Sequence, residues 1–310
     1  MKPIHSAPEL TPYQDEPLQL PSGAPGKNGF LRLGFERRGE KTALIHLHRR
    51  APLLAQQALY FDEEIPTLPC VMMISTSGGI LQGDRHTIEI DLAPHSQAHV
   101  TTQSATKIQE MDANYASQTQ EFVLGEGAYL EYLPDPIIPY KNSRFISRTR
   151  IVIPPSATLL YSEILMPGRK YYKDGELFQY DLYSSTVRAE RPAGAELFVE
   201  KFIIEPQRYA LRSKAVMGDF HVFANVLLMS PQEKFNRVAA QTNAMMDPAR
   251  NLAAGMSRLP NDAGLVFKVL GMEREPVEAK VREFWSIVRQ EVVGAKVPQK
   301  FRTARAAAAG

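Results

Sequence analysis

Two segments of the chain alternate between two sets of side chains with a period of two. Over residues 144–153, one set is Phe145, Ser147, Thr149, Ile151 and Ile153, and the other is Arg144, Ile146, Arg148, Arg150 and Val152. Over residues 88–92, Ile88, Ile90 and Leu92 alternate with Glu89 and Asp91. This period is typical of half-buried β-strands. We therefore predict a mainly β chain.

A unit made of a tight turn, an alanine and an apolar strand occurs five times. The five alanines are Ala43, Ala98, Ala128, Ala157 and Ala195. The middle three follow one another at a spacing of about thirty residues, which is in the range of stacked structural units. Stacking of such units would give a β-helix-like solenoid. An ordinary β-sandwich contains similar units without true repetition, so the residues alone leave both folds open.

Two helices are predicted in the C-terminal half. The sequence Ser-Pro-Gln-Glu at 230–233 has the form of a capping box with proline in the first turn, and the apolar spacing that follows predicts a helix over 231–246. A second apolar stripe after Pro276 predicts a helix over 276–293. The apolar segment 264–271 between them has the composition of a strand.

The two ends of the chain differ from its middle. Residues 1–28 are polar and rich in proline, and residues 303–310 contain a run of alanines. We expect a flexible N-terminal arm over 1–28, a single domain over 29–302 and a frayed tail over 303–310.

Composition narrows the function classes. Of the 310 residues, 44% are hydrophobic, which is ample for a core. The chain has 36 basic and 34 acidic residues, and this balance argues against a nucleic-acid-binding protein. Cys70 is the only cysteine, so no disulfide can form within the chain. No apolar run has the length of a membrane span and the N-terminus does not resemble a signal peptide, so we expect a cytoplasmic protein.

The segment around Gly78 has the glycine spacing of a phosphate-binding loop but not its chemistry. A nucleotide loop continues with lysine and a hydroxyl residue, whereas Asp84 follows Gly83 here and would repel phosphate. We therefore interpret this segment as a structural turn. No serine lies in a Gly-x-Ser-x-Gly elbow. An alternative function is a carbohydrate-active β-solenoid hydrolase with a carboxylate pair drawn from Asp84, Glu131, Asp135, Glu163 and Glu176.

The histidines do not form an evident metal site in the sequence. His46 and His48 would share one face of a strand, but nothing nearby completes a tight nickel or zinc site. Carboxylates and water hold borderline divalent ions more weakly than imidazole or thiolate does. The sequence thus argues against metal storage and leaves transient passage of a metal open.

Several motifs resemble those of the urease accessory protein UreD family, also called UreH. They are Gly78-Gly79-x-x-x-Gly83-Asp84, Thr101-Thr102-Gln103-x-x-Thr106-Lys107, Leu130-Glu131-x-Leu133-Pro134-x-Pro136-x-Ile138-Pro139-Tyr140, Glu163-x-x-x-x-Gly168-Arg169 and Gly175-Glu176-x-Phe178. The segment 264–271 and the helix with Trp285 extend the resemblance, which covers residues 29 to 302. Two departures are Tyr140, where phenylalanine is more usual, and the insertion-like segment 170–173.

This resemblance implies a fold and a role. The fold would be a β-helix-like solenoid of stacked strands with a helical C-terminal portion. The role would be that of a non-enzymatic maturation chaperone that docks on apo-urease, recruits UreF and the GTPase UreG, and assists nickel delivery. No tightly bound cofactor is implied, with nickel only in transit. Because accessory assemblies are usually symmetric, we expect a two-fold symmetric heteromer.

The resemblance also gives candidate site residues. We expect Asp84, Glu131, Glu163 and Glu176 to line or support a nickel path; the alternative is that they bond buried turn backbone and Arg85, Arg144 or Arg169. Phe284 and Trp285 are candidates for partner docking, the alternative being that their helical stripe packs against the domain. The family-motif residues expected to have structural or functional roles are Gly78, Gly79, Gly83, Thr102, Gln103, Lys107, Pro134, Pro139, Gly168 and Arg169.

Overall fold

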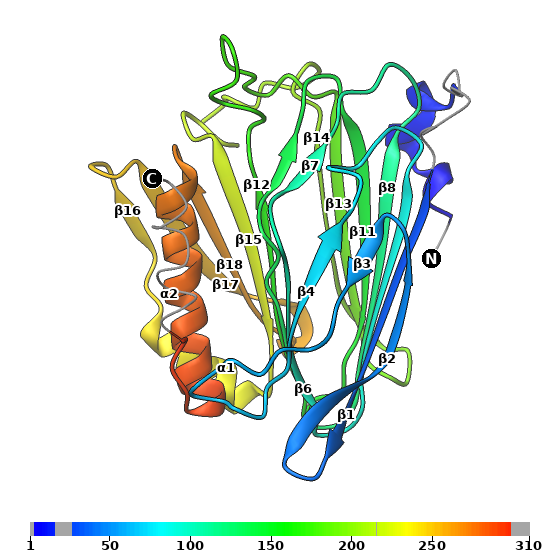
Figure 1. The fold of residues 1–310 in the computed structure, drawn as a ribbon. Coiled ribbons are helices and arrows are strands. Elements are labelled where there is room, and N and C mark those ends of the chain that lie inside the picture. The colour runs from blue at the N-terminus through cyan, green and yellow to red at the C-terminus, as the bar shows by residue number, and fades with distance from the viewer. Residues whose placement is uncertain (1–2, 16–26, 215, 299–310) are drawn as a thin grey trace.

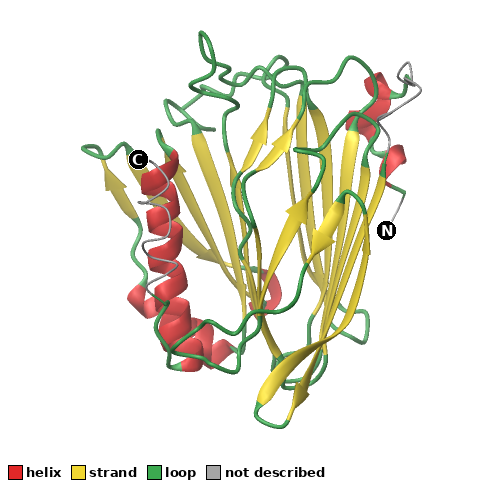
Figure 2. Ribbon diagram, in the orientation of Figure 1, coloured by secondary structure: helices red, strands yellow, loops and turns green. Residues whose placement is uncertain are grey.

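The computed structural model describes residues 3–15, 27–214 and 216–298. Over these residues, two large β-sheets face each other, and the two α-helices lie together on the outside of one sheet (Figures 1 and 2). The arrangement has three layers, which we name sheet A, sheet B and the helical layer.

Sheet A has the strand order β14-β13-β11-β8-β5-β1-β2. Its strands are β1 (Asn28–Arg38), β2 (Lys41–Arg50), β5 (Arg85–Leu92), β8 (Ala116–Leu124), β11 (Arg144–Val152), β13 (Leu182–Glu190) and β14 (Glu196–Ile204). From β1 to β13 neighbouring strands are parallel, and β2 and β14 pair antiparallel at the two edges.

Sheet B has the strand order β16-β17-β18-β15-β12-β9-β6-β4-β3, with β10 and β7 attached beside β12. The bounds are β3 (Leu53–Ala55), β4 (Cys70–Ser75), β6 (Gln97–Thr102), β7 (Thr106–Ile108), β9 (Tyr129–Tyr132), β10 (Ile137–Pro139), β12 (Thr158–Leu165), β15 (Val222–Met229), β16 (Met245–Asp247), β17 (Leu252–Arg258) and β18 (Gly264–Gly271). The strands β4, β6, β9 and β12 are parallel, whereas β15 to β18 form an antiparallel extension.

The repeated turn–alanine–strand unit corresponds to successive parallel strands of sheet B. Ala98 lies in β6, and Ala128 and Ala157 directly precede β9 and β12; all three are buried. Between these strands the chain crosses to sheet A and returns. The prediction of a mainly β chain is confirmed. The solenoid is not, because both sheets stay open and end in antiparallel strands.

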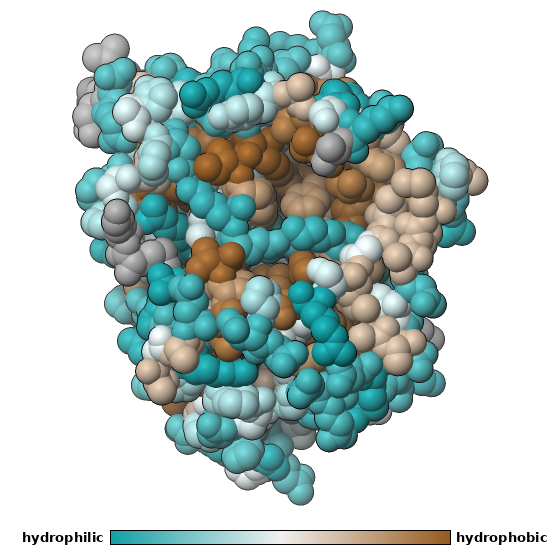
Figure 3. All heavy atoms as spheres, turned by 180° about the vertical axis from the view of Figure 1, so that it is seen from behind, coloured by the Kyte–Doolittle hydropathy of each residue, from teal (hydrophilic) through white to brown (hydrophobic). Residues whose placement is uncertain are grey.

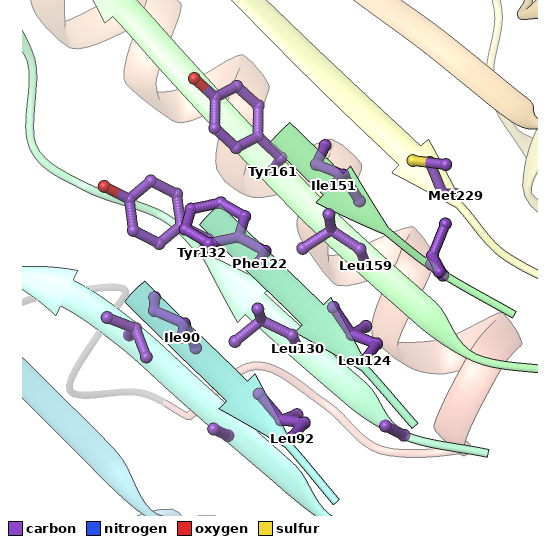
Figure 4. Packing of buried hydrophobic residues seen from close by; sticks show 14 of the residues in the cluster. Ile90, Leu92, Phe122, Leu124, Leu130, Tyr132, Ile151, Leu159, Tyr161 and Met229 are labelled. Carbon is purple, nitrogen blue, oxygen red and sulfur yellow. The ribbon is translucent and has the colours of Figure 1, made fainter. Parts of the chain in front are cut away.

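The main core lies between the two sheets. Ile90 and Leu92 of sheet A pack in one cluster with Leu130 and Leu159 of sheet B (Figure 4). The predicted alternation therefore places one side-chain set of each strand in this core. Burial of apolar side chains of this size is the main favourable contribution to folding.

The helices α1 (Gln232–Gln241) and α2 (Arg274–Val293) cover the outer face of sheet B. Their positions agree with the predicted helices, except that α1 ends at Gln241 instead of residue 246, because the chain becomes extended at Thr242 and then forms β16. The expected capping box does not form. Pro231 is the N-cap residue, and the Ser230 hydroxyl bonds Thr158 at 2.9 Å instead. No helix in the described ranges is both long and apolar enough to span a membrane.

Part of the expected N-terminal arm is packed against sheet A. Residues 3–15 contain the 3₁₀ helices η1 (Ile4–Ser6) and η2 (Pro8–Tyr13), and a third, η3 (Pro260–Asp262), lies near the C-terminal strands. Leu10 is fully buried in a cluster with Ile146 and Leu182, and the Glu9 carboxylate accepts a hydrogen bond from Ser184. This contact explains why Ile146 is buried although it belongs to the outward set of its strand. Residues 16–26 and the expected tail 303–310 lie outside the described residues.

The surface opposite the view of Figure 1 carries apolar residues gathered around a central hollow. Hydrophilic residues surround this region and cross it (Figure 3). Apolar surface rimmed by polar residues is a feature of interaction sites.

Candidate functional site

A cavity of about 160 Å³ lies between the two sheets. Three motifs that are distant in the sequence meet in its wall: the turn at Gly78, the segment that follows β6, and the chain after β9. Six of the ten family-motif residues line it, namely Gly78, Gly79, Thr102, Gln103, Lys107 and Pro134. Gly83, Pro139, Gly168 and Arg169 are not among the lining residues. The cavity is therefore where the sequence motifs converge.

Glycine is required at position 79 by close packing. A Cβ atom there would lie 2.9 Å from the Lys107 carbonyl oxygen, closer than real Cβ contacts allow. The backbone N–H of Ile80 donates to the same carbonyl at 2.8 Å. The glycine turn is thus held against β7 as part of the cavity wall, which agrees with its interpretation as a structural turn.

The buried Asp84 carboxylate stabilises the glycine turn by bonding backbone N–H groups. Asp84 is fully buried, and its carboxylate accepts hydrogen bonds from the backbone N–H groups of Lys27 and Leu81, each at 2.9 Å. The Arg85 guanidinium donates to the backbone carbonyl oxygens of Tyr115 at 2.6 Å and of Asp84 at 3.0 Å. These bonds match the alternative expectation for Asp84, a carboxylate that supports turn backbone.

Glu163, on β12, is the only one of the four carboxylates expected on a nickel path that lines the cavity, and Asp135 lines it as well. It is 5% exposed, and its oxygens accept hydrogen bonds from Tyr161 at 3.0 Å, Tyr183 at 2.8 Å and Ser185 at 2.9 Å. All three partners are neutral hydroxyls. Burial raises the pKa of Glu163 above its ordinary value, against the effect of these hydrogen bonds. None of the ion pairs between described residues includes Glu163, so a buried acid faces the cavity without a cationic partner.

Glu131, on β9, faces away from the cavity toward α2. Its Oε1 accepts from Tyr129, from Trp285 Nε1 at 2.7 Å and from Arg289 Nε at 2.6 Å. Its Oε2 bonds His99 Nδ1 at 2.8 Å and Arg289 Nη2 at 2.9 Å. Although burial opposes ionisation, the Arg289 guanidinium and these donors hold the pKa of Glu131 below its ordinary value. Glu131 thus binds the helical layer to sheet B.

Phe284 and Trp285 are both part of this helical packing. Phe284 is 1% exposed and stacks on Phe267 with ring centroids 4.5 Å apart, and Trp285 is 5% exposed. Neither side chain is available at the surface as a docking anchor in this structure. Their positions correspond to the alternative expectation, a helical stripe packed against the domain.

Glu176 lies in the loop between β12 and β13 and pairs with Arg169. The Arg169 Nε atom donates to Glu176 Oε2 at 2.6 Å, and the guanidinium lies between the rings of Tyr140 and Tyr172. Hydrogen bonding by Arg169 lowers the pKa of Glu176. The two departures from the family pattern thus meet here, since Tyr140 and Tyr172 enclose the Arg169–Glu176 pair.

Lys170 lies in the same segment. It bonds the Met272 carbonyl oxygen at 3.1 Å and so connects the loop to the residues just before α2.

Other polar residues of the cavity wall were not among the predicted site residues. They include His86, Gln120, Ser147, Tyr132 and Tyr161. Gln120 accepts a hydrogen bond from Thr149 at 2.8 Å and donates to Tyr132.

The inward position of His86 could have been predicted from the strand alternation. His86 is separated by two and four residues from Ile88 and Ile90, so all three side chains point to the same, buried face of β5. Glu200 on β14 is a further acid, and its charge contributes to the raised pKa of Glu163.

A metal site with three or more protein ligands is not present in the ranges that the structure describes. No group of three His, Cys, Asp or Glu side chains there could hold one ion. Burial raises the pKa of the Cys70 thiol to about 12, so this thiol is protonated at neutral pH. A metal bound among the described residues of the cavity would therefore have at most two ligands of these four residue types.

Comparison with known proteins identifies close relatives over nearly the whole chain. The family model described as UreD urease accessory protein matches residues 27–303. The chain is 60% identical over 298 residues to urease accessory protein UreD 2 of Brucella suis biovar 1, covering 96% of this chain and 99% of that protein. It is 53% identical over 296 residues to urease accessory protein UreD of Yersinia pseudotuberculosis serotype O:1b, covering 96% of this chain and 92% of that protein.

Proposed function

The chain belongs to the UreD family of urease accessory proteins, and we propose that it is a cytoplasmic, non-catalytic scaffold for urease maturation. It docks on apo-urease, recruits UreF and, through UreF, the GTPase UreG, and assists nickel delivery to the urease active site. Nucleotide chemistry belongs to the partner in this proposal, because Asp84 occupies the position after the glycines where a nucleotide loop needs lysine. The complex is a two-fold symmetric heteromer.

The observation that carries the nickel part of the proposal is the position of Glu163. A buried carboxylate is stabilised by a nearby cation, and Glu163 has only hydroxyl partners. It lies in the wall of the cavity where the family motifs meet. A divalent ion entering this cavity would supply the missing positive charge. Since a single carboxylate and water bind nickel weakly, the ion could also leave.

The contacts of the four carboxylates support different roles in such a path. Glu163 lines the cavity. Asp84 does not line it, but its carboxylate lies near His86, which does. Glu131 and Glu176 already bond the guanidinium groups of Arg289 and Arg169. We therefore assign Glu131 and Glu176 a supporting role and keep Glu163 and Asp84 as the candidates for contact with nickel.

A carbohydrate hydrolase is the alternative that the geometry supports less well. Such an enzyme needs two carboxyl groups on either side of a sugar-sized cleft. The cavity has a volume of about 160 Å³, whereas ligand pockets usually measure about 300–1,000 Å³. Of the five carboxylates considered, only Asp135 lines the cavity together with Glu163. The cavity size thus favours passage of an ion over binding of a saccharide.

Co-expression with the urease subunits and the partner accessory proteins tests the scaffold proposal. Omission of this chain should abolish nickel-dependent urease activity, and an affinity tag on the chain should co-purify apo-urease and UreF. A urease that reaches full activity without the chain would contradict the proposal. Release of sugars from polysaccharide by the purified chain would support the hydrolase instead.

A further inference from the structure

Arg212 and His221 form a side-chain contact that closes the chain between β14 and β15. The Arg212 Nη2 atom lies 3.0 Å from His221 Nε2, and Arg212 Nη1 donates to the Asp219 carbonyl oxygen at 3.1 Å. Because a guanidinium is only a donor, Nε2 accepts this hydrogen bond and the proton of the neutral ring is on Nδ1. The contact therefore fixes one tautomer of a neutral imidazole.

The surroundings of His221 match a neutral ring. His221 is 7% exposed, and its Nδ1 atom is buried without a hydrogen-bond partner among the described residues. Protonation would turn Nε2 into a second donor, which would face the donors of Arg212. The hydrogen bond to Arg212 would then be lost, and two positive charges would lie next to each other.

Charged groups from three segments of the chain act on His221. Lys170, in the loop between β12 and β13, and Arg212 oppose a positive charge on the ring, whereas Glu273, just before α2, and Asp219 favour it. The Glu273 carboxylate already forms an ion pair with Lys170. Burial, together with the two nearby cations, lowers the pKa of His221 below its ordinary value of 6.5.

We propose that Arg212 and His221 form a pH-sensitive clamp, which holds residues 205–214 in place at neutral pH and releases them in acid. The neutral His221 ring accepts the Arg212 hydrogen bond and keeps the loop closed. When the pH falls below 6.5, the open loop takes up a proton more readily than the closed loop, so the equilibrium shifts toward the open loop. This inference is independent of nickel delivery, because it concerns only the conformational equilibrium of the loop.

Phe178 connects the clamp to the loop between β12 and β13. The Arg212 guanidinium lies 5.7 Å from the centroid of the Phe178 ring, and the His221 ring contacts it edge-on with centroids 6.1 Å apart. The Phe178 carbonyl oxygen accepts a hydrogen bond from Gln207 Nε2 at 3.1 Å. Phe178 has a φ of 55°, which is unfavourable for a bulky side chain, so these contacts hold it against its backbone preference. Opening of the clamp would therefore affect both loops.

Hydrogen exchange of the purified full-length chain tests the clamp. Protection factors, which correct for the intrinsic pH dependence of exchange, are measured for peptides within residues 205–214. Between about pH 7.5 and about pH 5.5, we expect protection to fall by at least about threefold in the unaltered protein. The fall should disappear in His221→Gln, because the glutamine carbonyl oxygen can accept from Arg212 but does not titrate. The matched control is His48→Gln, which changes an exposed histidine on β2 and should keep the fall.

Isotope labelling of the histidine rings and NMR spectroscopy give a second measurement, at the ring itself. The neutral His221 ring should carry its proton on Nδ1, and Arg212→Met should raise the pKa of His221 and weaken this preference. Arg212 is exposed, so this variant tests the clamp even if His221→Gln does not fold. A neutral ring protonated on Nε2 would overturn the inference. Unchanged protection in the unaltered protein, or an equal fall in a folded His221→Gln variant, would also overturn it.

Discussion

Arg289 on α2 and Glu131 on β9 form a buried, two-pronged ion pair that joins the helical layer to sheet B. The Nε–Oε1 and Nη2–Oε2 distances are 2.6 and 2.9 Å, and both side chains are fully buried. Arg289 also bonds Asp62 Oδ2 at 2.6 Å, and this bond connects the segment before β4 to α2. One guanidinium thus connects three parts of the chain that are distant in sequence.

Replacing Arg289 by methionine should destabilise the protein strongly. The change leaves Glu131 and Asp62 buried without their cation, and loss of one partner of a buried pair costs about 3–5 kcal/mol. Chemical denaturation measures the free energy of unfolding. The control is Arg32→Met, because the Arg32 side chain is 50% exposed in its pair with Asp91 and such pairs contribute about 1 kcal/mol or less. Equal losses in the two variants would show that the Arg289 pair has no special role.

The Glu131 carboxylate should make stability depend on pH in the acid range. Its pKa in the folded protein lies below the ordinary value of 4.5. Its contribution is therefore present above pH 4.5 and is lost as the pH falls through the lower, folded-state value. The difference in unfolding free energy between the unaltered protein and Glu131→Gln should shrink as the pH is lowered below 4.5. A difference that stays constant or grows toward acid pH would refute this assignment.

Gly79→Ala should disrupt the cavity wall. The added Cβ would lie 2.9 Å from the Lys107 carbonyl oxygen, and backbone cannot move as easily as the end of a side chain. The control is Gly39→Ala, since Gly39 also has a positive φ, of 64°, but a Cβ atom added there would meet no atom within 4 Å. We expect a loss of about 1–2 kcal/mol for Gly39→Ala from the backbone conformation alone and a larger loss for Gly79→Ala. Thermal unfolding of the two variants side by side measures the difference.

Leu10→Ala tests whether the N-terminal segment contributes to the fold. Leu10 is fully buried against Ile146 and Leu182, and such truncations cost about 2–5 kcal/mol. Leu47→Ala is the control, because Leu47 is 37% exposed on the edge strand β2 and its loss should change stability by about 0.5 kcal/mol or less. An unchanged melting temperature for Leu10→Ala would instead support the flexible arm expected from the sequence.

Strand alternation predicted two strands of sheet A, β5 and β11, because the pattern is local. The outer face of β5 is partly exposed, so its polar and apolar residues alternate and reveal which side chains point inward. Sheet B lies between sheet A and the helices, and β9 and β12 are buried along their whole length. The period of two is lost when both faces are buried.

This loss of pattern explains why the sequence could not distinguish the roles of Glu131 and Glu163. Glu131 and Glu163 occupy neighbouring strands of sheet B, but Glu131 faces α2 and Glu163 faces the cavity. Glu131 bonds Arg289 and Glu163 bonds Tyr183. Both partners lie on other elements, so the local sequence around each glutamate does not reveal them. The end of α1 was also overestimated, because Met245 continues the apolar helical spacing although it belongs to β16.

The most direct measurement of the central claim is transfer of isotopically labelled nickel into urease with Glu163→Ala. The control is Glu126→Ala, because Glu126 is exposed in the turn before β9 and does not line the cavity. Co-purification with apo-urease and UreF confirms that both variants assemble. We predict that Glu163→Ala lowers nickel incorporation by at least about tenfold while Glu126→Ala leaves it unchanged. Normal incorporation by an assembled Glu163→Ala complex would contradict the claim that nickel passes this carboxylate.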